Sequence, residues 1–145
     1  MESPVFALSD AYIDRLAELD PGFATGLGIA GSDHLMTDFS PAGHEAMESL
    51  SRQTLAKLNS LNQSSDTDRL AAGVLRNSLE MSEREFAAGE HLRAIRVLAG
   101  NVDYARSVFD LMPTDTPDQW RTIAERMSHV PAAFNGMRES WQLGM

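Results

Sequence analysis

The sequence predicts an all-α protein, an irregular bundle of about five or six helices around one long central helix. Apolar residues recur three and four positions apart through most of the chain, which is the period of an α-helix. Ser-Pro or Thr-Pro pairs, which are typical helix starts, stand at Ser3-Pro4, Ser40-Pro41 and Thr116-Pro117. No segment alternates apolar and polar residues over a strand's length, so we expect no sheet.

The central helix is predicted over residues 66–99, a stretch that contains no proline. At 100° per residue its large apolar side chains fall into two stripes on nearly opposite sides. The stripes are Leu70, Val74, Met81, Ala88, Leu92 and Ile95, and Leu75, Leu79, Phe86 and Val97. Two stripes predict that other helices pack on both sides of this one. Gly89 is the expected break, because an interior glycine costs about 1 kcal/mol relative to alanine.

Two helices are expected before the central one. The first begins at Ser3-Pro4 and ends at Asp20-Pro21, since the residue before proline disfavours the helical conformation. A glycine-rich connection covers residues 23–31, and its G-x-G-x-x-G string lacks the strand and helix of a nucleotide site, so we interpret it as chance. The second helix runs from Ser40-Pro41 to Leu61.

The C-terminal part is predicted to contain shorter helices. One covers residues 102–112, and Pro113 ends it. Another begins at Thr116-Pro117, and Pro131 marks either a new start or a kink. The last apolar stripe consists of Val130, Phe134, Met137 and Trp141. We expect part of this face to be uncovered, and therefore a homodimer, or contact with the remainder of a longer chain, through a surface that includes Trp141.

The charge of the chain disfavours a nucleic-acid partner. The formal net charge is −9, and residues 1–50 hold nine acidic residues and one basic residue. Phosphates would be repelled by that first third. There is no cysteine, and neither a signal peptide nor an apolar run of membrane-spanning length is apparent. We therefore expect a cytoplasmic protein that binds neither nucleic acid nor a membrane.

One weak metal motif is present. The segment from His44 to Glu48 resembles the zinc motif H-E-x-x-H, but glutamate stands where the second histidine would be. His44 and Glu48 could share a helix face, yet no third ligand can be identified. We therefore prefer the interpretation of an exposed helix N-terminus, where the helix dipole favours Glu45. His91 and His129 have no recognisable partners. The sequence therefore assigns no catalytic, cofactor-binding or metal-binding residue.

The order of several short motifs resembles a large bacterial family, the domain of unknown function numbered 885. They are Tyr12…Leu19-Asp20-Pro21…Ala24-Thr25…Leu27-Gly28-Ile29, Asp38, Ser40-Pro41, Leu111-Met112-Pro113…Trp120…Arg126-Met127 and Val130-Pro131. Members of that family look like zinc metallopeptidases, are longer and largely helical, and carry H-E-x-x-H in their later part. The resemblance implies zinc for the parent family but none in this chain.

Three functional interpretations follow. The resemblance implies that residues 1–145 are a single α-helical domain, the N-terminal portion of a bacterial metallopeptidase-like hydrolase, and non-catalytic by themselves. The alternative is a stand-alone helical protein-interaction module that docks through the 134–141 face. A third interpretation is a small metal- or ligand-binding bundle centred on His44. A reading frame that continues to H-E-x-x-H would distinguish the first from the second.

Overall fold

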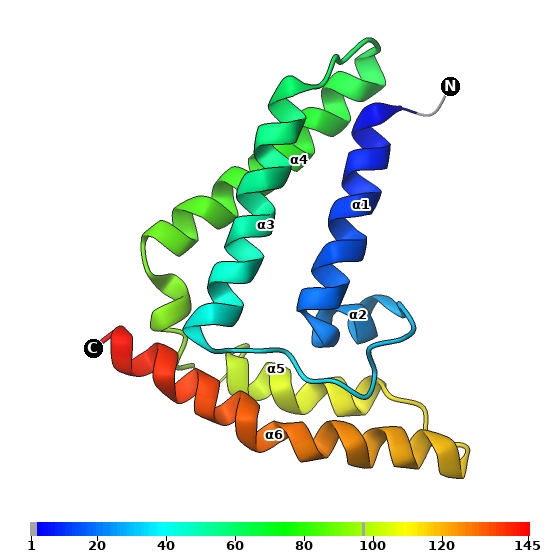
Figure 1. Cartoon of the computed structure of the whole chain (residues 1–145), viewed down its shortest axis with the longest axis vertical. Coiled ribbons are helices and arrows are strands. Elements are labelled where there is room, and N and C mark those ends of the chain that lie inside the picture. The colour runs from blue at the N-terminus through cyan, green and yellow to red at the C-terminus, as the bar shows by residue number, and fades with distance from the viewer. Residues whose placement is uncertain (1–2, 97) are drawn as a thin grey trace.

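A computed structural model describes residues 3–96 and 98–145, and its ordered elements are all helical (Figure 1). No strand is present among these residues, so the all-α prediction is confirmed. The α-helices are α1 (Pro4–Leu19), α2 (Pro21–Leu27), α3 (Pro41–Ser60), α4 (Asp66–Ala87), α5 (Asn101–Ser107) and α6 (Pro117–Leu143). Two 3-10 helices, η1 (Glu90–Leu92) and η2 (Val108–Leu111), complete the chain.

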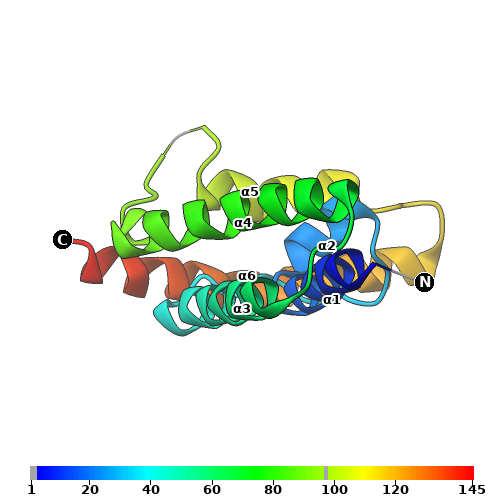
Figure 2. The same ribbon diagram turned by 90° about the horizontal axis from the view of Figure 1, so that it is seen from above.

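The helices form two crossed groups. The first helix, α1, packs beside α3, and α4 contacts both of them. The last helix, α6, runs across the ends of α1 and α3 with α5 alongside it (Figure 1). Seen from above, α4 and α5 lie in one layer and α1, α3 and α6 in the other (Figure 2). None of the described helices combines the length and the apolar character that crossing a bilayer requires.

The predicted helix starts are confirmed by their caps. The side chains of Ser3 and Ser40 accept hydrogen bonds from backbone N–H groups of the first turns of α1 and α3. Ser65 and Thr116 form reciprocal capping boxes at α4 and α6. Each cap satisfies donors that the helix itself leaves unpaired. These starts are local, which is why short sequence patterns located them.

The connection expected over residues 23–31 is partly helical. Asp20 ends α1 and also caps α2, because its side chain accepts from the N–H of Phe23. Helix α2 ends at Gly28, whose φ of 71° lies in the left-handed region that glycine adopts without strain. The glycine string therefore belongs to a helix end and a turn, and no strand precedes it.

The long central stretch is not one helix. Helix α4 ends at Ala87, and Gly89, with φ of 72°, separates it from η1, as the glycine predicted. Leu79 is buried, but Leu70 and Val74 are 71% and 65% exposed. The prediction of neighbours on both sides of this helix is therefore wrong, because α1 and α3 cover only one side. Val97 lies outside the described residues.

The C-terminal helix passes through Pro131 without ending. The predicted stripe is split, since Met137 is fully buried whereas Phe134 is exposed. Trp141 is partly buried against a cluster that consists of Phe39, Ala105, Ala133 and Met137. The 130–141 stripe is therefore not a single uncovered face. At Gly136 a Cβ atom would stand 2.7 Å from the backbone nitrogen of Ser40, so α6 lies directly against the segment that leads into α3.

Arg126 joins α6 to the segment between α2 and α3. Its guanidinium is fully buried, and Nε donates to the carbonyl oxygen of Leu35 at 2.7 Å. Its Nη2 donates to Thr25 Oγ1 at 2.8 Å and to the carbonyl oxygens of Ser32 and Pro21 at 3.2 and 3.3 Å. Burial lowers the pKa of Arg126, and the nearby Asp33 opposes that effect. The arginine thus satisfies carbonyl groups of a non-helical segment.

Replacing Arg126 with methionine should destabilise the protein by about 2–4 kcal/mol, because buried carbonyl groups would lose their donors. Arg121→Met, on an exposed part of the same helix, is the matched control and should change stability by less than about 0.5 kcal/mol. Urea unfolding followed by circular dichroism measures both. Equal effects of the two substitutions would contradict the assigned role of Arg126.

Candidate functional site

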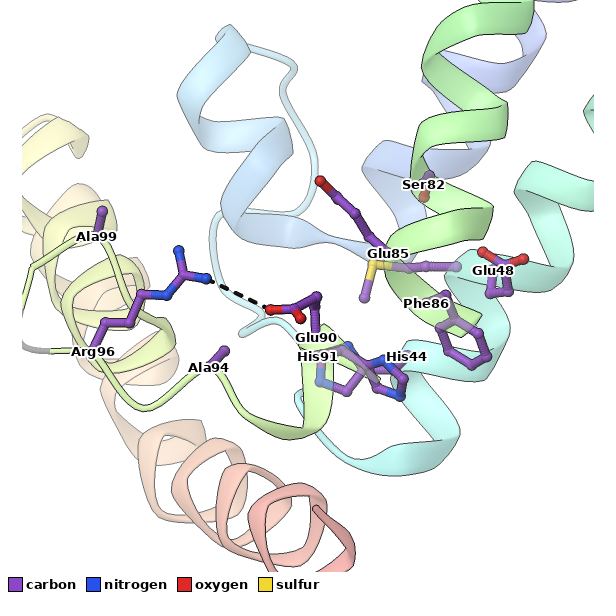
Figure 3. A pocket seen from close by; sticks show the side chains of 11 residues that line it. His44, Glu48, Ser82, Glu85, Phe86, Glu90, His91, Ala94, Arg96 and Ala99 are labelled. Carbon is purple, nitrogen blue, oxygen red and sulfur yellow. Dashed lines mark ion pairs between the residues drawn. The ribbon is translucent and has the colours of Figure 1, made fainter. Parts of the chain in front are cut away.

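A cavity of about 520 Å³ lies between the start of α3, the end of α4 and the segment that follows Gly89 (Figure 3). Its lining combines aromatic rings, carboxylates and one arginine. The lining residues are His44, Met47, Glu48, Ser82, Glu85, Phe86, Glu90, His91, Ala94, Arg96 and Ala99. This mixture of apolar surface and convergent polar groups is typical of ligand-binding sites.

Three rings from three elements meet in this cavity. Phe86, in the last turn of α4, stacks on His91 with ring centroids 4.2 Å apart and planes 1° apart. His44, in the first turn of α3, lies 5.1 Å from His91 at 56°. The left-handed conformation of Gly89 turns the chain back after α4, and this turn places His91 over Phe86.

Several polar atoms of the cavity are buried without a hydrogen-bond partner among the described residues. They are His44 Nε2, His91 Nδ1 and Glu48 Oε2. Only 3% of the Glu48 side chain is exposed, and its other oxygen, Oε1, lies 3.7 Å from Arg52 Nε. Burial raises the pKa of the Glu48 carboxyl, and Arg52 opposes the rise. Unpartnered buried polar atoms are uncommon in folded proteins and call for a structural or functional explanation.

Both imidazoles favour the neutral form. Burial is the main cause that lowers the pKa of His44, and repulsion by His91 lowers it further, whereas Asp38 raises it. Burial also lowers the pKa of His91, with Glu45 opposing. At neutral pH the rings therefore add no positive charge to a cavity that Glu48, Glu85 and Glu90 line. Such a site can accept hydrogen bonds and attract cations.

The structure places in one cavity residues that the sequence pattern alone did not connect. His44 and Glu48 line one cavity, and His91, interpreted as partnerless, also lines it, so that interpretation is wrong. Gly89, two residues before His91, was the one sequence feature that could have indicated a turn of the chain back toward Phe86. Asp33 and Asp38, which lie near His44 in the sequence, are engaged elsewhere: Asp33 accepts from Thr25 Oγ1 at 2.7 Å and Asp38 accepts from the N–H of Ser40 at 2.9 Å.

The donor set does not fit a metal ion. Among residues 3–96 and 98–145, no group of three or more His, Cys, Asp or Glu side chains is arranged to hold a metal. The cavity nevertheless contains two imidazoles and a buried carboxylate. We therefore derive no metal chemistry from it and consider the cavity as a site for other ligands.

A family model described as "Bacterial protein of unknown function (DUF885)" matches residues 21–145. The chain belongs to this bacterial family. The match covers α2 to α6, and therefore both the Arg126 contacts and the cavity around His44 and His91. A search of curated proteins found no match to the chain. Membership confirms the family named by the sequence motifs, and it leaves the activity to be proposed.

The free energy of unfolding should fall as the pH is lowered from about 7.5 to about 5.5. The pKa values of His44 and His91 lie below the ordinary 6.5 in the folded protein, so the unfolded chain binds protons first. The raised pKa of Glu48 acts in the opposite direction, because the folded protein then takes up that proton more readily. The two histidines should dominate at the upper end of this range.

Urea melts at several pH values measure this dependence. The double substitution His44→Asn and His91→Asn should flatten the curve, whatever it does to absolute stability. His129→Asn is the control, since His129 is exposed on α6, away from the cavity. If the free energy of unfolding of the double variant depended on pH as steeply as that of the wild type, His44 and His91 would not be the cause of the pH dependence.

Proposed function

We propose that the chain is a non-catalytic helical portion of a bacterial metallopeptidase-like hydrolase, the N-terminal part of a longer protein that packs against a catalytic part. An uncovered apolar groove between α1 and α4 supports the proposal. Its volume is about 430 Å³, and it is lined by Val5, Phe6, Ser9, Tyr12, Ile13, Ala71, Val74, Leu75 and Ser78. Zinc in this proposal would be bound by the remainder of the protein, because the described part of this chain offers no donor set that fits it.

The groove continues onto an exposed apolar strip of α4. Leu70 and Val74 of α4 are 71% and 65% exposed, and Met81, two turns after Val74, is also exposed. Phe6 of α1, which lines the groove, is 44% exposed. Contiguous apolar surface of this kind usually marks a contact with another polypeptide. The covering segment in this proposal is the remainder of the same chain, and a cytoplasmic location is part of the proposal.

The alternative is a stand-alone interaction module, and the same groove favours it. Trp141, expected to dock such a partner, packs partly on its own cluster. Exposed apolar side chains lie on α1 and α4 and also on α6, where Trp120, Met127 and Phe134 are 56%, 58% and 41% exposed. A homodimer through Trp141 stays a prediction. The reading frame distinguishes the two proposals. Only the N-terminal portion of a hydrolase requires a frame that continues and encodes H-E-x-x-H.

Purified residues 1–145 should hydrolyse no peptide, with or without added zinc, because no three-ligand zinc set is apparent among the residues that the structure describes. A quenched fluorescent peptide library measures turnover. Zinc-dependent cleavage that disappears in His44→Ala would contradict the non-catalytic assignment and would support a site at the cavity.

The docking face can be tested by comparing two lengths of the protein. Val74→Glu should change the stability of residues 1–145 little, because Val74 is exposed. In the product of the full reading frame it should cost about 1–3 kcal/mol more, since the carboxylate would be buried in the contact. Gln53→Glu, exposed on α3, is the control and should cost the same in both lengths. Equal costs for Val74→Glu would contradict the proposed contact.

A further inference from the structure

We propose that the cavity formed by His44, Phe86 and His91 binds an organic cation, a primary ammonium or a guanidinium group. This inference does not depend on the proposed contact between the α1–α4 groove and a catalytic part. It rests on a buried carboxylate that lacks a full set of partners, on a wall of three rings, and on an excess of acidic groups around the cavity (Figure 3).

Glu48 provides the acceptor. Its side chain is almost completely buried, Oε2 has no hydrogen-bond partner among the described residues, and Oε1 has only Arg52 Nε at 3.7 Å. That separation is too long for a hydrogen bond. A carboxylate in such surroundings is destabilised unless a donor reaches it. An ammonium or guanidinium group carries several N–H donors and a positive charge, and would satisfy it.

The rings provide a surface that tolerates a cation. Phe86 and His91 are stacked, and His44 is tilted against His91 from the facing helix. The electron-rich faces of aromatic rings attract cations, and a planar guanidinium can stack on them while its edge donates hydrogen bonds. His44 Nε2 and His91 Nδ1, which have no partners, are further polar atoms within the same cavity.

The charged residues on α3, α4 and η1, and on the segment before α3, favour a cation in the cavity. The acidic residues are Asp38 before α3, Glu45 and Glu48 on α3, Glu83 and Glu85 on α4, and Glu90 on η1. The basic residues are Arg52, Arg93 and Arg96, and each of them pairs with one of these carboxylates. Carboxylates therefore outnumber the cations, and the resulting negative potential would concentrate a positively charged ligand.

The size of the cavity suits a small organic ligand better than an ion. A volume of about 520 Å³ lies within the range of small-molecule sites. A divalent metal would need at least three converging ligands, and the described residues do not provide them. Two sources of the same chemistry remain, a free amine and a basic side chain of a peptide.

Titration of residues 1–145 with agmatine, which carries both an ammonium and a guanidinium group, tests the proposal. We expect saturable binding by calorimetry, with shifts of the His44 and His91 ring signals in nuclear magnetic resonance spectra. Acetyl-Gly-Arg-Gly-amide is the peptide arm, and N-methylurea is the uncharged control. Tighter binding of the peptide would assign a basic side chain as the ligand, and tighter binding of agmatine would assign a free amine.

Glu48→Gln should weaken agmatine binding at least about tenfold. Glu18→Gln, exposed on α1, is the matched control and should leave binding unchanged. Phe86→Leu removes one ring and should also weaken binding, which keeps the test valid if Glu48→Gln unfolds. Absence of binding by both cations at about 10 mM, equal binding by Glu48→Gln, or binding of zinc alone would overturn the proposal.

Discussion

The burial of Arg126 against backbone carbonyl groups holds the two halves of the bundle together. Residues between α2 and α3 have few helical hydrogen bonds of their own, so their carbonyl groups need donors from elsewhere. Arg126 supplies these donors to Ser32 and Leu35, and it also donates to the carbonyl oxygen of Pro21 at the start of α2. Asp20 completes the arrangement, because it accepts hydrogen bonds from Thr37 Oγ1 at 2.5 Å and from Tyr104 OH at 3.1 Å. These polar contacts fix the segment together with the burial of Phe39 against Ala133 and Met137 of α6.

The position of the cavity depends on this segment. Ser140 Oγ donates to the carbonyl oxygen of Phe39 at 2.7 Å, and Gly136 allows the backbone at Ser40 to lie directly against α6. Ser40 then caps α3, whose first turn carries His44. At the other side, Gly144 lies against the carbonyl oxygen of Leu92, so α6 also supports the segment that carries His91. Both histidines are thus positioned through contacts with α6.

The sequence predicted what local chemistry determines. Ser3, Ser40 and Thr116 were recognisable as caps because the acceptor, the proline and the apolar period lie within a few residues. The exposure of Leu70 could not be predicted in this way, because periodicity identifies an apolar face but not whether a neighbour covers it. The burial of Arg126 and the meeting of His44 with His91 depend equally on contacts between residues far apart in the sequence.

Helix α4 connects the two sites that the structure leaves available. Its first half borders the apolar groove with α1, and its last turns carry Glu85 and Phe86 into the cavity. Ser78 and Ser82, one turn apart on α4, line the groove and the cavity respectively. A polypeptide seated on Val74 and Met81 would therefore approach the rim of the cavity at Glu85. The groove and the cavity are therefore neighbours along one helix, although no residue that the structure describes lines both of them.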